Sequence, residues 1–336
     1  MRVGIIGLGR AGRVHLDAWR QVPGVEVVAA CDRSAASRRF ARESGLRSYT
    51  EPAYLVGHEE IDAVSICTPP VHHAPAAIAC LERGIDVLCE KPLATNGHAA
   101  LEMLRVATRE RRQLLLATKF RHTPDLVAAR QLIRDGAIGD PIAFEIDFSS
   151  MVDMSKRWNC RRAVAGGGVI IDNGCHALDI VTYLFGTVAK VQATRLKPVQ
   201  NIGVEDSATI VVAAGRGLIG RIEVSWSLAT GRETFVTVYG SKGTIEVGWR
   251  GSRLRVAGKD PQPIGPGYDK NEAHVRMLEA FKGVCAGTTA PWITPVEVMR
   301  TVATVEAAYV SMRTGGWVQV DMMGMREAAG RVRKRA

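Results

Sequence analysis

The 336-residue chain lacks the features that define several classes of protein. No uninterrupted apolar run approaches the roughly 20 residues that a membrane-spanning helix needs, which argues against an integral membrane protein. The seven cysteines form no C-x-x-C pair, and their odd number fits free thiols in a reducing compartment. Arg10 and Arg13 interrupt the apolar N-terminal stretch too early for an export signal, and no small-residue cleavage site follows. The sequence therefore predicts a cytoplasmic location.

A signature for nucleic-acid binding is also missing, although the formal net charge is +10. No helix-turn-helix, zinc-finger or RNA-binding motif accompanies the basic residues. Residues 326–336 contain five basic side chains and one acidic one, so five minus one, or +4, of this charge lies in a tail that we expect to be mobile. The remaining charge suits an enzyme that binds anionic ligands. We expect no nucleic-acid partner.

What the chain has is a globular composition, with 46% hydrophobic and 23% charged residues. At roughly 100–200 residues per domain, the length predicts two domains. Glycine is in excess, at about 10% of the residues against an average near 7%. Several of these glycines are clustered, which favours close approaches of the backbone to a ligand.

The first 120 residues alternate short apolar runs with amphipathic patterns, which is typical of the βαβ units of a doubly wound parallel sheet. The expected strands are Arg2–Ile6, Glu26–Cys31, Ala63–Cys67, Asp86–Cys89 and Gln113–Ala117. The expected crossover helices are Gly12–Gln21, Ala35–Ser44, Ala74–Arg83 and Gly97–Arg111. We therefore place an N-terminal Rossmann domain at residues 1–122.

After Pro124 the pattern becomes that of an α+β domain, which we place at residues 123–325, followed by the basic tail at 326–336. In Leu218–Leu228 the apolar and polar residues alternate, so that Val224 faces a core while Ser225 lies on the opposite face of an antiparallel sheet. The expected elements are a helix at Asp125–Asp135, strands at Ile142–Phe148, from Val188 onward, and at Ala208–Ala213, Leu218–Leu228, Thr234–Tyr239 and Thr244–Val247, a helix at Val296–Arg313 and a short final strand. The alternation predicts that this domain contains an antiparallel sheet with one covered face.

A dinucleotide fingerprint follows the first strand and opens the first helix, as Gly7-Leu8-Gly9-Arg10-Ala11-Gly12. The first glycine allows the tight turn, the second lets the backbone approach a pyrophosphate, and the third permits helix–strand packing. All six residues are therefore candidate cofactor contacts. Asp32 ends the second strand, where a carboxylate binds the ribose hydroxyls and repels a 2′-phosphate, so it favours NAD. Arg33 and Ser34 beside it leave NADP open as the alternative cofactor.

Two further loops leave the carboxyl ends of expected strands, where open α/β sheets bind ligands. Thr68, Pro69 and His73 in the first loop are candidate cofactor contacts; for His73, a proline-stiffened turn that caps the next helix is the alternative. Glu90-Lys91-Pro92 forms the second loop, in which Glu90 and Lys91 are further candidate cofactor contacts. Its lysine would act near an oxidised nicotinamide as a hydrogen-bond donor or with a lowered pKa, and a surface Lys–Glu pair is the alternative.

A glycine-rich turn at Gly166–Gly168 leads into an apolar helix that extends to about Phe185. Polar residues spaced four, three and four apart share one face of this helix; they are Asp172, His176, Asp179 and Tyr183. The rest of the helix is apolar and therefore buried, so this stripe must face a cleft or a satisfied network of hydrogen bonds. A carboxylate one turn before a histidine suits general acid–base catalysis, because it orients the imidazole.

In this order the motifs resemble those of the Gfo/Idh/MocA oxidoreductases, which include glucose–fructose oxidoreductase and inositol dehydrogenases. The resemblance covers nearly the whole chain: Gly7-x-Gly-x-x-Gly12-x-x-His15, Thr68-Pro69, Glu90-Lys91-Pro92, Arg157-Trp158, Gly166–Asp179 and Tyr239–Thr244. It implies NAD(P)-dependent hydride transfer at a hydroxyl of a sugar, aminosugar, sugar derivative or cyclitol. It also implies that the second domain has a large, mostly antiparallel open sheet, through which a homodimer or homotetramer forms. No metal is expected.

The resemblance assigns catalysis to Lys91, Asp172 and His176, with His176 taking the hydroxyl proton and Lys91 bonding the same oxygen. The candidate substrate contacts are Lys91, Arg121, Arg157, Trp158, Asn159 and His176, and the arginines would suit an anionic sugar. Two alternatives share the fold. One is a glycoside-cleaving enzyme that forms a transient keto-sugar, and the other is a cofactor-sensing regulator without turnover.

Overall fold

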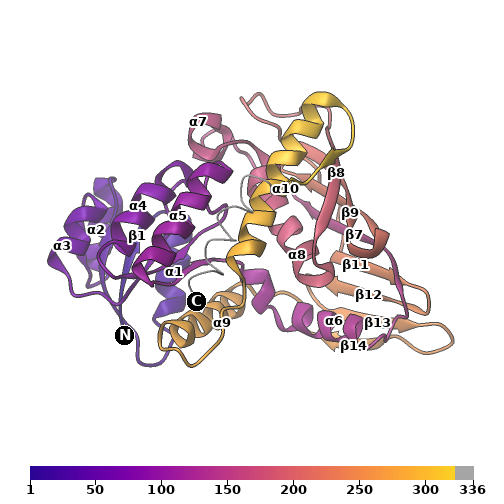
Figure 1. Cartoon of the computed structure of the whole chain (residues 1–336), viewed down its shortest axis with the longest axis horizontal. Coiled ribbons are helices and arrows are strands. Elements are labelled where there is room, and N and C mark those ends of the chain that lie inside the picture. The colour runs from indigo at the N-terminus through magenta and orange to yellow at the C-terminus, as the bar shows by residue number, and fades with distance from the viewer. Residues whose placement is uncertain (322–336) are drawn as a thin grey trace. The chain divides into compact units, whose positions relative to one another are not determined.

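The computed structural model describes residues 1–321, except for the side chain of Arg216 (Figure 1). These residues form two compact units. Unit 1 comprises Met1–Lys119 and His274–Val298, and unit 2 comprises Phe120–Ala273 and residues 299–321. The sequence-based division at residue 122 placed 274–298 in the second domain, whereas the structure packs this segment with the first. The expected basic tail at 326–336 lies outside the described residues.

Unit 1 contains the doubly wound parallel sheet that the alternating pattern predicted. Its six strands are all parallel to their neighbours and have the order β3-β2-β1-β4-β5-β6. The order reverses between β1 and β4, so the carboxyl ends of these strands are where a ligand is expected. The strands are β1 (Arg2–Ile6), β2 (Glu26–Cys31), β3 (Arg47–Tyr49), β4 (Ala63–Ile66), β5 (Asp86–Cys89) and β6 (Leu114–Leu116).

The crossover helices of unit 1 are α1 (Arg10–Trp19), α2 (Ala35–Glu43), α3 (Pro52–His58), α4 (His73–Leu81), which follows the short η1 (Pro70–His72), and α5 (Gly97–Glu110). Strand β3, helix α3 and a further helix, α9 (Lys270–Cys285), were not expected from the sequence; the residues of α9 from His274 onward belong to unit 1. Phe281 of α9 is fully buried and lies against Trp19 of α1, with ring centroids 6.3 Å apart. Lys282 of α9 also donates a hydrogen bond to the carbonyl of Pro23. Aromatic packing and this bond therefore hold α9 on unit 1.

Unit 2 contains a nine-stranded sheet in the order β14-β13-β12-β11-β7-β10-β9-β8-β15. Only β7 and β10 pair in parallel; the other paired strands are antiparallel, as predicted. The strands are β7 (Pro141–Ser149), β8 (Val188–Arg195), β9 (Ser207–Ala214), β10 (Ile219–Ser225), β11 (Thr234–Gly240), β12 (Gly243–Gly248), β13 (Ser252–Val256), β14 (Gln262–Gly265) and β15 (Val318–Gln319). The sequence patterns did not reveal β13 and β14.

Helices cover one face of this sheet: α6 (Pro124–Arg134) contacts β12 and β14, and α8 (Cys175–Phe185) contacts β7 and β9. The other helical segments of the unit are η2 (Lys119–His122), η3 (Trp158–Cys160), α7 (Arg162–Ala165), η4 (Ile170–Gly174), η5 (Gly215–Gly217) and α10 (Pro295–Thr314), the first and last of which extend into unit 1. Among residues 1–321, no helix combines the length and the apolar character needed to cross a bilayer.

The opposite face of the sheet is the open one. Arg221 and Glu145 lie on neighbouring strands of this face and form an ion pair at 3.4 Å, and Tyr239 of β11 is 39% exposed. Ser225 of β10 lies on the face opposite to Val224, as expected, but it is fully buried there. Its hydroxyl hydrogen-bonds that of Ser207 on β9 at 2.7 Å, and this pairing compensates for the burial.

Candidate active site

The glycine turn after β1 has the close contacts that its three glycines require. Gly7 has a φ of +89°, and its N–H donates to the carbonyl of Cys31 at 2.7 Å. A Cβ atom at Gly12 would lie 1.9 Å from the carbonyl oxygen of Gly7, so only glycine fits at that position. A Cβ atom at Gly9, by contrast, would have nothing within 4 Å. The N-terminus of α1 is therefore open at Gly9, where a pyrophosphate could approach the backbone amides.

Asp32 is fixed directly beside this turn. One carboxylate oxygen accepts the N–H of Leu8 at 2.7 Å, and the other accepts the N–H of Ser34 at 2.8 Å. Each oxygen has a second lone pair, so the pair of ribose hydroxyls can still bind. The exposed side chain of Arg33 lies 3.5 Å from Glu51. The fixed carboxylate would repel a 2′-phosphate, and this geometry suits NAD.

Thr68, at the carboxyl end of β4, supplies a further test of the cofactor's fit. Its hydroxyl oxygen is buried, and none of the residues within 1–321 hydrogen-bonds it. Buried polar groups are normally satisfied, so an unmatched hydroxyl beside the switch point of the sheet indicates a ligand group. Together with the open Gly9 and the ordered Asp32, Thr68 makes unit 1 a fitting site for a dinucleotide.

His73 joins the two loops that were expected to carry ligand contacts. The side chain is fully buried, with Nδ1 2.9 Å from the carbonyl of Pro92 and Nε2 2.7 Å from the carbonyl of Thr68. Burial lowers the pKa of this imidazole, although both carbonyl contacts act in the opposite direction. Because both ring nitrogens face the backbone, the geometry favours a structural role for His73, and its direct contact with the cofactor stays a prediction.

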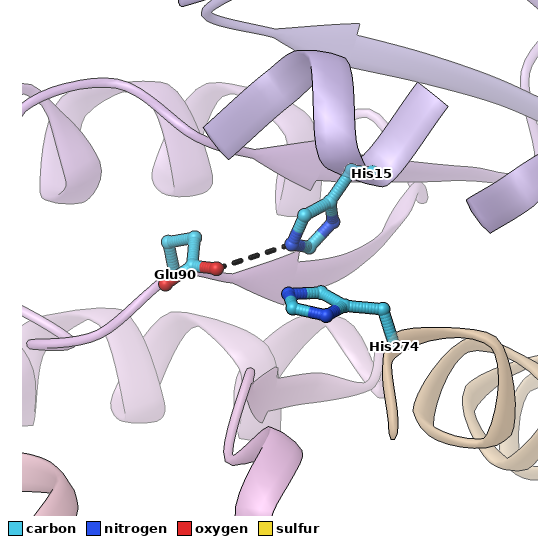
Figure 2. Close-up of side chains that lie close together, drawn as sticks. All are labelled: His15, Glu90 and His274. Carbon is cyan, nitrogen blue, oxygen red and sulfur yellow. Dashed lines mark hydrogen bonds and ion pairs between the residues drawn. The ribbon is translucent and has the colours of Figure 1, made fainter. Parts of the chain in front are cut away.

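Lys91 follows β5 in a loop that Glu90 braces. One oxygen of Glu90 accepts the backbone N–H of Lys91 at 3.0 Å, and the other lies 3.1 Å from Nε2 of the buried His15 (Figure 2). Burial alone would raise the pKa of Glu90, but the hydrogen bond and charge of His15 and the charges of Lys91 and Lys119 hold it well below its usual range. Glu90 is therefore an ionised brace for the loop, and its expected contact with the cofactor stays a prediction.

In unit 2, the glycines at the start of the α8 region approach the protein itself, which corrects the expectation that they approach a ligand. A Cβ atom at Gly167 would lie 1.9 Å from the hydroxyl of Tyr309, and one at Gly168 would lie 2.1 Å from the carbonyl of Glu205. One carboxylate oxygen of Glu205 accepts the N–H groups of Gly168 and Ile170 at 3.0 and 3.1 Å. The Tyr309 hydroxyl donates to the same oxygen at 2.7 Å.

These two residues anchor the segment that leads into α8. Burial raises the pKa of Tyr309 far above its usual value, and the charge and hydrogen bond of Glu205 act in the same direction. The phenol therefore stays protonated as a donor. Sequence reasoning missed both residues, because they lie far from the glycines along the chain and match no motif.

A π-helical turn, η4 (Ile170–Gly174), precedes α8, so the uniform spacing assumed for the polar stripe does not hold. Such turns are frequent at functional sites. Within 167–184 every residue is buried except Asp172, Asn173 and His176, which are partly exposed. The His176 ring packs edge-on against Phe120, with centroids 5.1 Å apart. Two of the predicted catalytic residues are thus among the three accessible polar groups of an otherwise buried segment.

The other half of the stripe is structural. Asp179 accepts hydrogen bonds from Nε and Nη2 of Arg121 at 3.1 and 2.8 Å, and both side chains are at most 4% exposed. The Arg121 guanidinium also lies over the ring of Tyr183, with its carbon 5.3 Å from the centroid. This matches the buried-network alternative for Asp179 and Tyr183. Arg121 supports α8 in this arrangement, and its role as a substrate contact stays a prediction.

The remaining substrate candidates lie in one loop and short helix of unit 2. Arg157 is exposed, and Trp158 and Asn159, which belong to η3, are partly exposed. Their accessibility permits a contact with substrate, which stays a prediction.

Three potential metal ligands lie together in unit 1, although the sequence indicated no metal. His15, Glu90 and His274 each offer one ligand atom, and these atoms all lie within 4.8 Å of one another (Figure 2). His15 belongs to the first motif but was given no role, and His274 lies on the unexpected helix α9.

A doubly wound sheet with a glycine turn, an ordered Asp32 and an open helix N-terminus is typical of a dinucleotide-binding unit. Comparison with family models agrees: residues 1–118 match the "Oxidoreductase family, NAD-binding Rossmann fold" and residues 126–246 match the "GFO/IDH/MocA C-terminal domain". The chain belongs to the Gfo/Idh/MocA family of oxidoreductases.

Characterised relatives are similar over much of their length. The chain is 29% identical to D-apiose dehydrogenase of Paraburkholderia graminis, over 95% of this chain and 89% of the relative. It is 27% identical to inositol 2-dehydrogenase of Rubrobacter xylanophilus, over 73% and 70% of the two chains. Levoglucosan dehydrogenase in complex with NADH has the same fold, with a TM-score of 0.86 at 21% identity, over 96% of this chain and 99% of the other.

Proposed function

We propose that the protein transfers a hydride between NAD and a secondary hydroxyl, or the matching ketone, of a sugar, aminosugar, sugar derivative or cyclitol. Relatives named D-apiose dehydrogenase, levoglucosan dehydrogenase and inositol 2-dehydrogenase support this substrate class. The observation that carries the proposal is the partial exposure of Asp172 and His176 on a segment that is otherwise almost entirely buried. A buried helix with two accessible acid–base groups suits proton transfer to or from a polar substrate.

Bound NAD supplies the hydride acceptor. The amides of the Gly7–Gly12 turn would hold its pyrophosphate, Asp32 its adenosine ribose, and Thr68 a further polar group. The fixed Asp32 favours NAD over NADP. The loop Glu90-Lys91-Pro92 then places the positively charged Lys91 side chain near the reacting oxygen.

In the direction of oxidation, the substrate hydroxyl gives its proton to His176, and a hydride leaves the carbon that bears this hydroxyl. Asp172 orients the imidazole and stabilises its protonated form, while Lys91 donates a hydrogen bond to the substrate oxygen. Acid–base catalysis of this kind contributes about 10²–10⁴-fold to the rate. Arg121, Arg157, Trp158 and Asn159 are the proposed substrate contacts.

The test is a turnover screen of sugars, aminosugars and cyclitols, including inositol, D-apiose and levoglucosan, with NAD and with NADP. Net formation of reduced nicotinamide, greater with NAD, supports the proposal. Cleavage of a glycoside at constant cofactor would replace it by the transient-oxidation alternative. An absence of turnover, together with ligand-dependent binding of a partner protein, would replace it by a regulatory role.

A homodimer or homotetramer belongs to the same proposal. The open face of the nine-stranded sheet exposes Tyr239 and Ile219, which flank Ala143 on neighbouring strands. Exposed apolar side chains on one sheet face favour association between copies. Sedimentation velocity of the wild type and of Tyr239→Lys tests it: a monomeric wild type, or an unchanged oligomer in the variant, would contradict this interface. A cytoplasmic location stays a prediction.

A further inference from the structure

A line of polar contacts connects helix α1 to the lysine loop inside unit 1. The indole N–H of Trp19 donates to the Ser65 hydroxyl at 2.9 Å, and Nδ1 of His15 lies 3.1 Å from the same hydroxyl. Nε2 of His15 lies 3.1 Å from Glu90, which in turn accepts the backbone N–H of Lys91 at 3.0 Å. Each contact has hydrogen-bond length, so the line runs unbroken from α1 through β4 to the end of β5.

This line is shielded from solvent. His15 and Ser65 are fully buried, and the side chain of Glu90 is 15% exposed. His274 of α9 packs edge-on against His15, with ring centroids 5.6 Å apart (Figure 2). A carboxylate in such surroundings is stable only where its partners are fixed, and the loss of one partner leaves the other buried and unmatched. The geometry of Glu90 therefore depends on His15.

We propose that His15 and Glu90 are positioning residues for Lys91: His15 fixes the Glu90 carboxylate, and Glu90 fixes the backbone from which the lysine side chain extends. The inference rests on the proposed function, because it takes Lys91 to be the residue that touches the substrate. The inference also gives helix α1 two roles. The N-terminus of α1 is open at Gly9, where a pyrophosphate would bind, and His15 in the same helix contacts Glu90 of the lysine loop. Cofactor binding and lysine placement thus share one rigid element.

A metal ion is the competing explanation for this cluster. Imidazole and carboxylate groups suit Zn²⁺, and the ligand atoms of His15, Glu90 and His274 lie within 4.8 Å of one another. The 3.1 Å separation of His15 and Glu90 is also that of a direct hydrogen bond, which satisfies both groups without an ion. Elemental analysis of the purified protein decides: less than a tenth of an equivalent of any transition metal supports the positioning role, and one equivalent per chain overturns it.

The kinetic test compares His15→Met with His15→Gln. Methionine fills a similar volume without a donor, whereas the glutamine amide can still donate to Glu90. Glu90→Gln removes the charge, and His98→Gln, at an exposed position on α5, is the matched control. Turnover is followed with the most active of inositol, D-apiose and levoglucosan, and NADH binding by fluorescence titration.

We expect His15→Met and Glu90→Gln to lower kcat about 10- to 100-fold, because a small misplacement of a catalytic group has effects of this size. In His15→Met, NADH affinity and substrate KM should stay within about twofold, and His15→Gln should recover most of the activity. Equal loss in His15→Gln and His15→Met, or loss of NADH binding in step with kcat, would overturn the positioning role.

Lys91→Ala in the same assay separates the two proposals. An inactive Lys91→Ala alongside fully active His15→Met and Glu90→Gln would refute the positioning role and leave the proposed function intact. A fully active Lys91→Ala would refute the catalytic role of the lysine and, with it, this inference.

Discussion

Replacing Tyr309 by phenylalanine should destabilise unit 2 measurably, because its hydroxyl anchors the segment that leads to His176. The hydroxyl donates to Glu205 at 2.7 Å and accepts the N–H groups of Gly168 and Ile171 at 3.1 and 3.3 Å. The substitution removes one hydrogen bond to a charged group and takes an acceptor from Ile171. Tyr309 is only 9% exposed, and its ring keeps its packing in the variant.

A hydrogen bond to a charged group contributes about 1.5–3 kcal/mol, and a buried donor left without an acceptor costs about 1–3 kcal/mol. We therefore expect Tyr309→Phe to lower the free energy of unfolding by about 3 kcal/mol and Tm by about 6–12 °C. Urea and thermal denaturation measure the change. Tyr54→Phe is the control, since Tyr54 is 56% exposed on α3. A loss in Tyr309→Phe no larger than that in Tyr54→Phe would refute the anchoring role.

Three further predictions concern the cofactor turn and pH. Gly12→Ala places a Cβ atom 1.9 Å from the Gly7 carbonyl, so NADH affinity should fall at least 10-fold by fluorescence titration, and unchanged affinity would contradict the tight turn. Asp32→Ser should weaken NAD binding about 10- to 100-fold and narrow the preference over NADP, measured as the ratio of kcat/KM values; an unchanged ratio would contradict the ribose contact. Burial, with a smaller contribution from the charge of Arg121, lowers the pKa of His122 from 6.5 to about 4. The unfolded chain therefore takes up this proton first, and stability should fall as pH drops from about 6.5 to 4, more steeply than in His122→Gln; equal slopes in urea denaturation would contradict it.

Periodicity predicted most of the regular elements, because the strands of unit 1 are buried apolar runs bounded by turns. Helix α9 also left a signal that was not used: Ala273, Met277 and Phe281 recur every four residues and are all fully buried. The unit that α9 joins is decided by its contacts with Trp19 and Pro23. These residues lie far from α9 along the chain, so the local sequence does not predict the contacts.

The site was predicted in part, for a related reason. Asp172 and Asp179 are the same residue type on one apparent stripe, yet Asp172 is partly exposed and Asp179 is buried. Arg121, 58 positions away, holds Asp179 in a buried ion pair. Glu205, 35 positions from Ile170, and Tyr309, 141 positions from Gly168, hold the segment that contains the π turn and Asp172. Local spacing can identify candidate polar residues, but distant partners decide which of them are structural.

The account's central claim is that Lys91 and His176 do acid–base work in hydride transfer, and the single-turnover rate tests it most directly. Stopped-flow absorbance of reduced nicotinamide would compare wild type, Lys91→Ala and His176→Ala at saturating NAD, with the most active compound of the screen. The account predicts that each variant is slower by about 10²–10⁴-fold and that His176→Ala keeps its NADH affinity. Rates within twofold of wild type in both variants would contradict it.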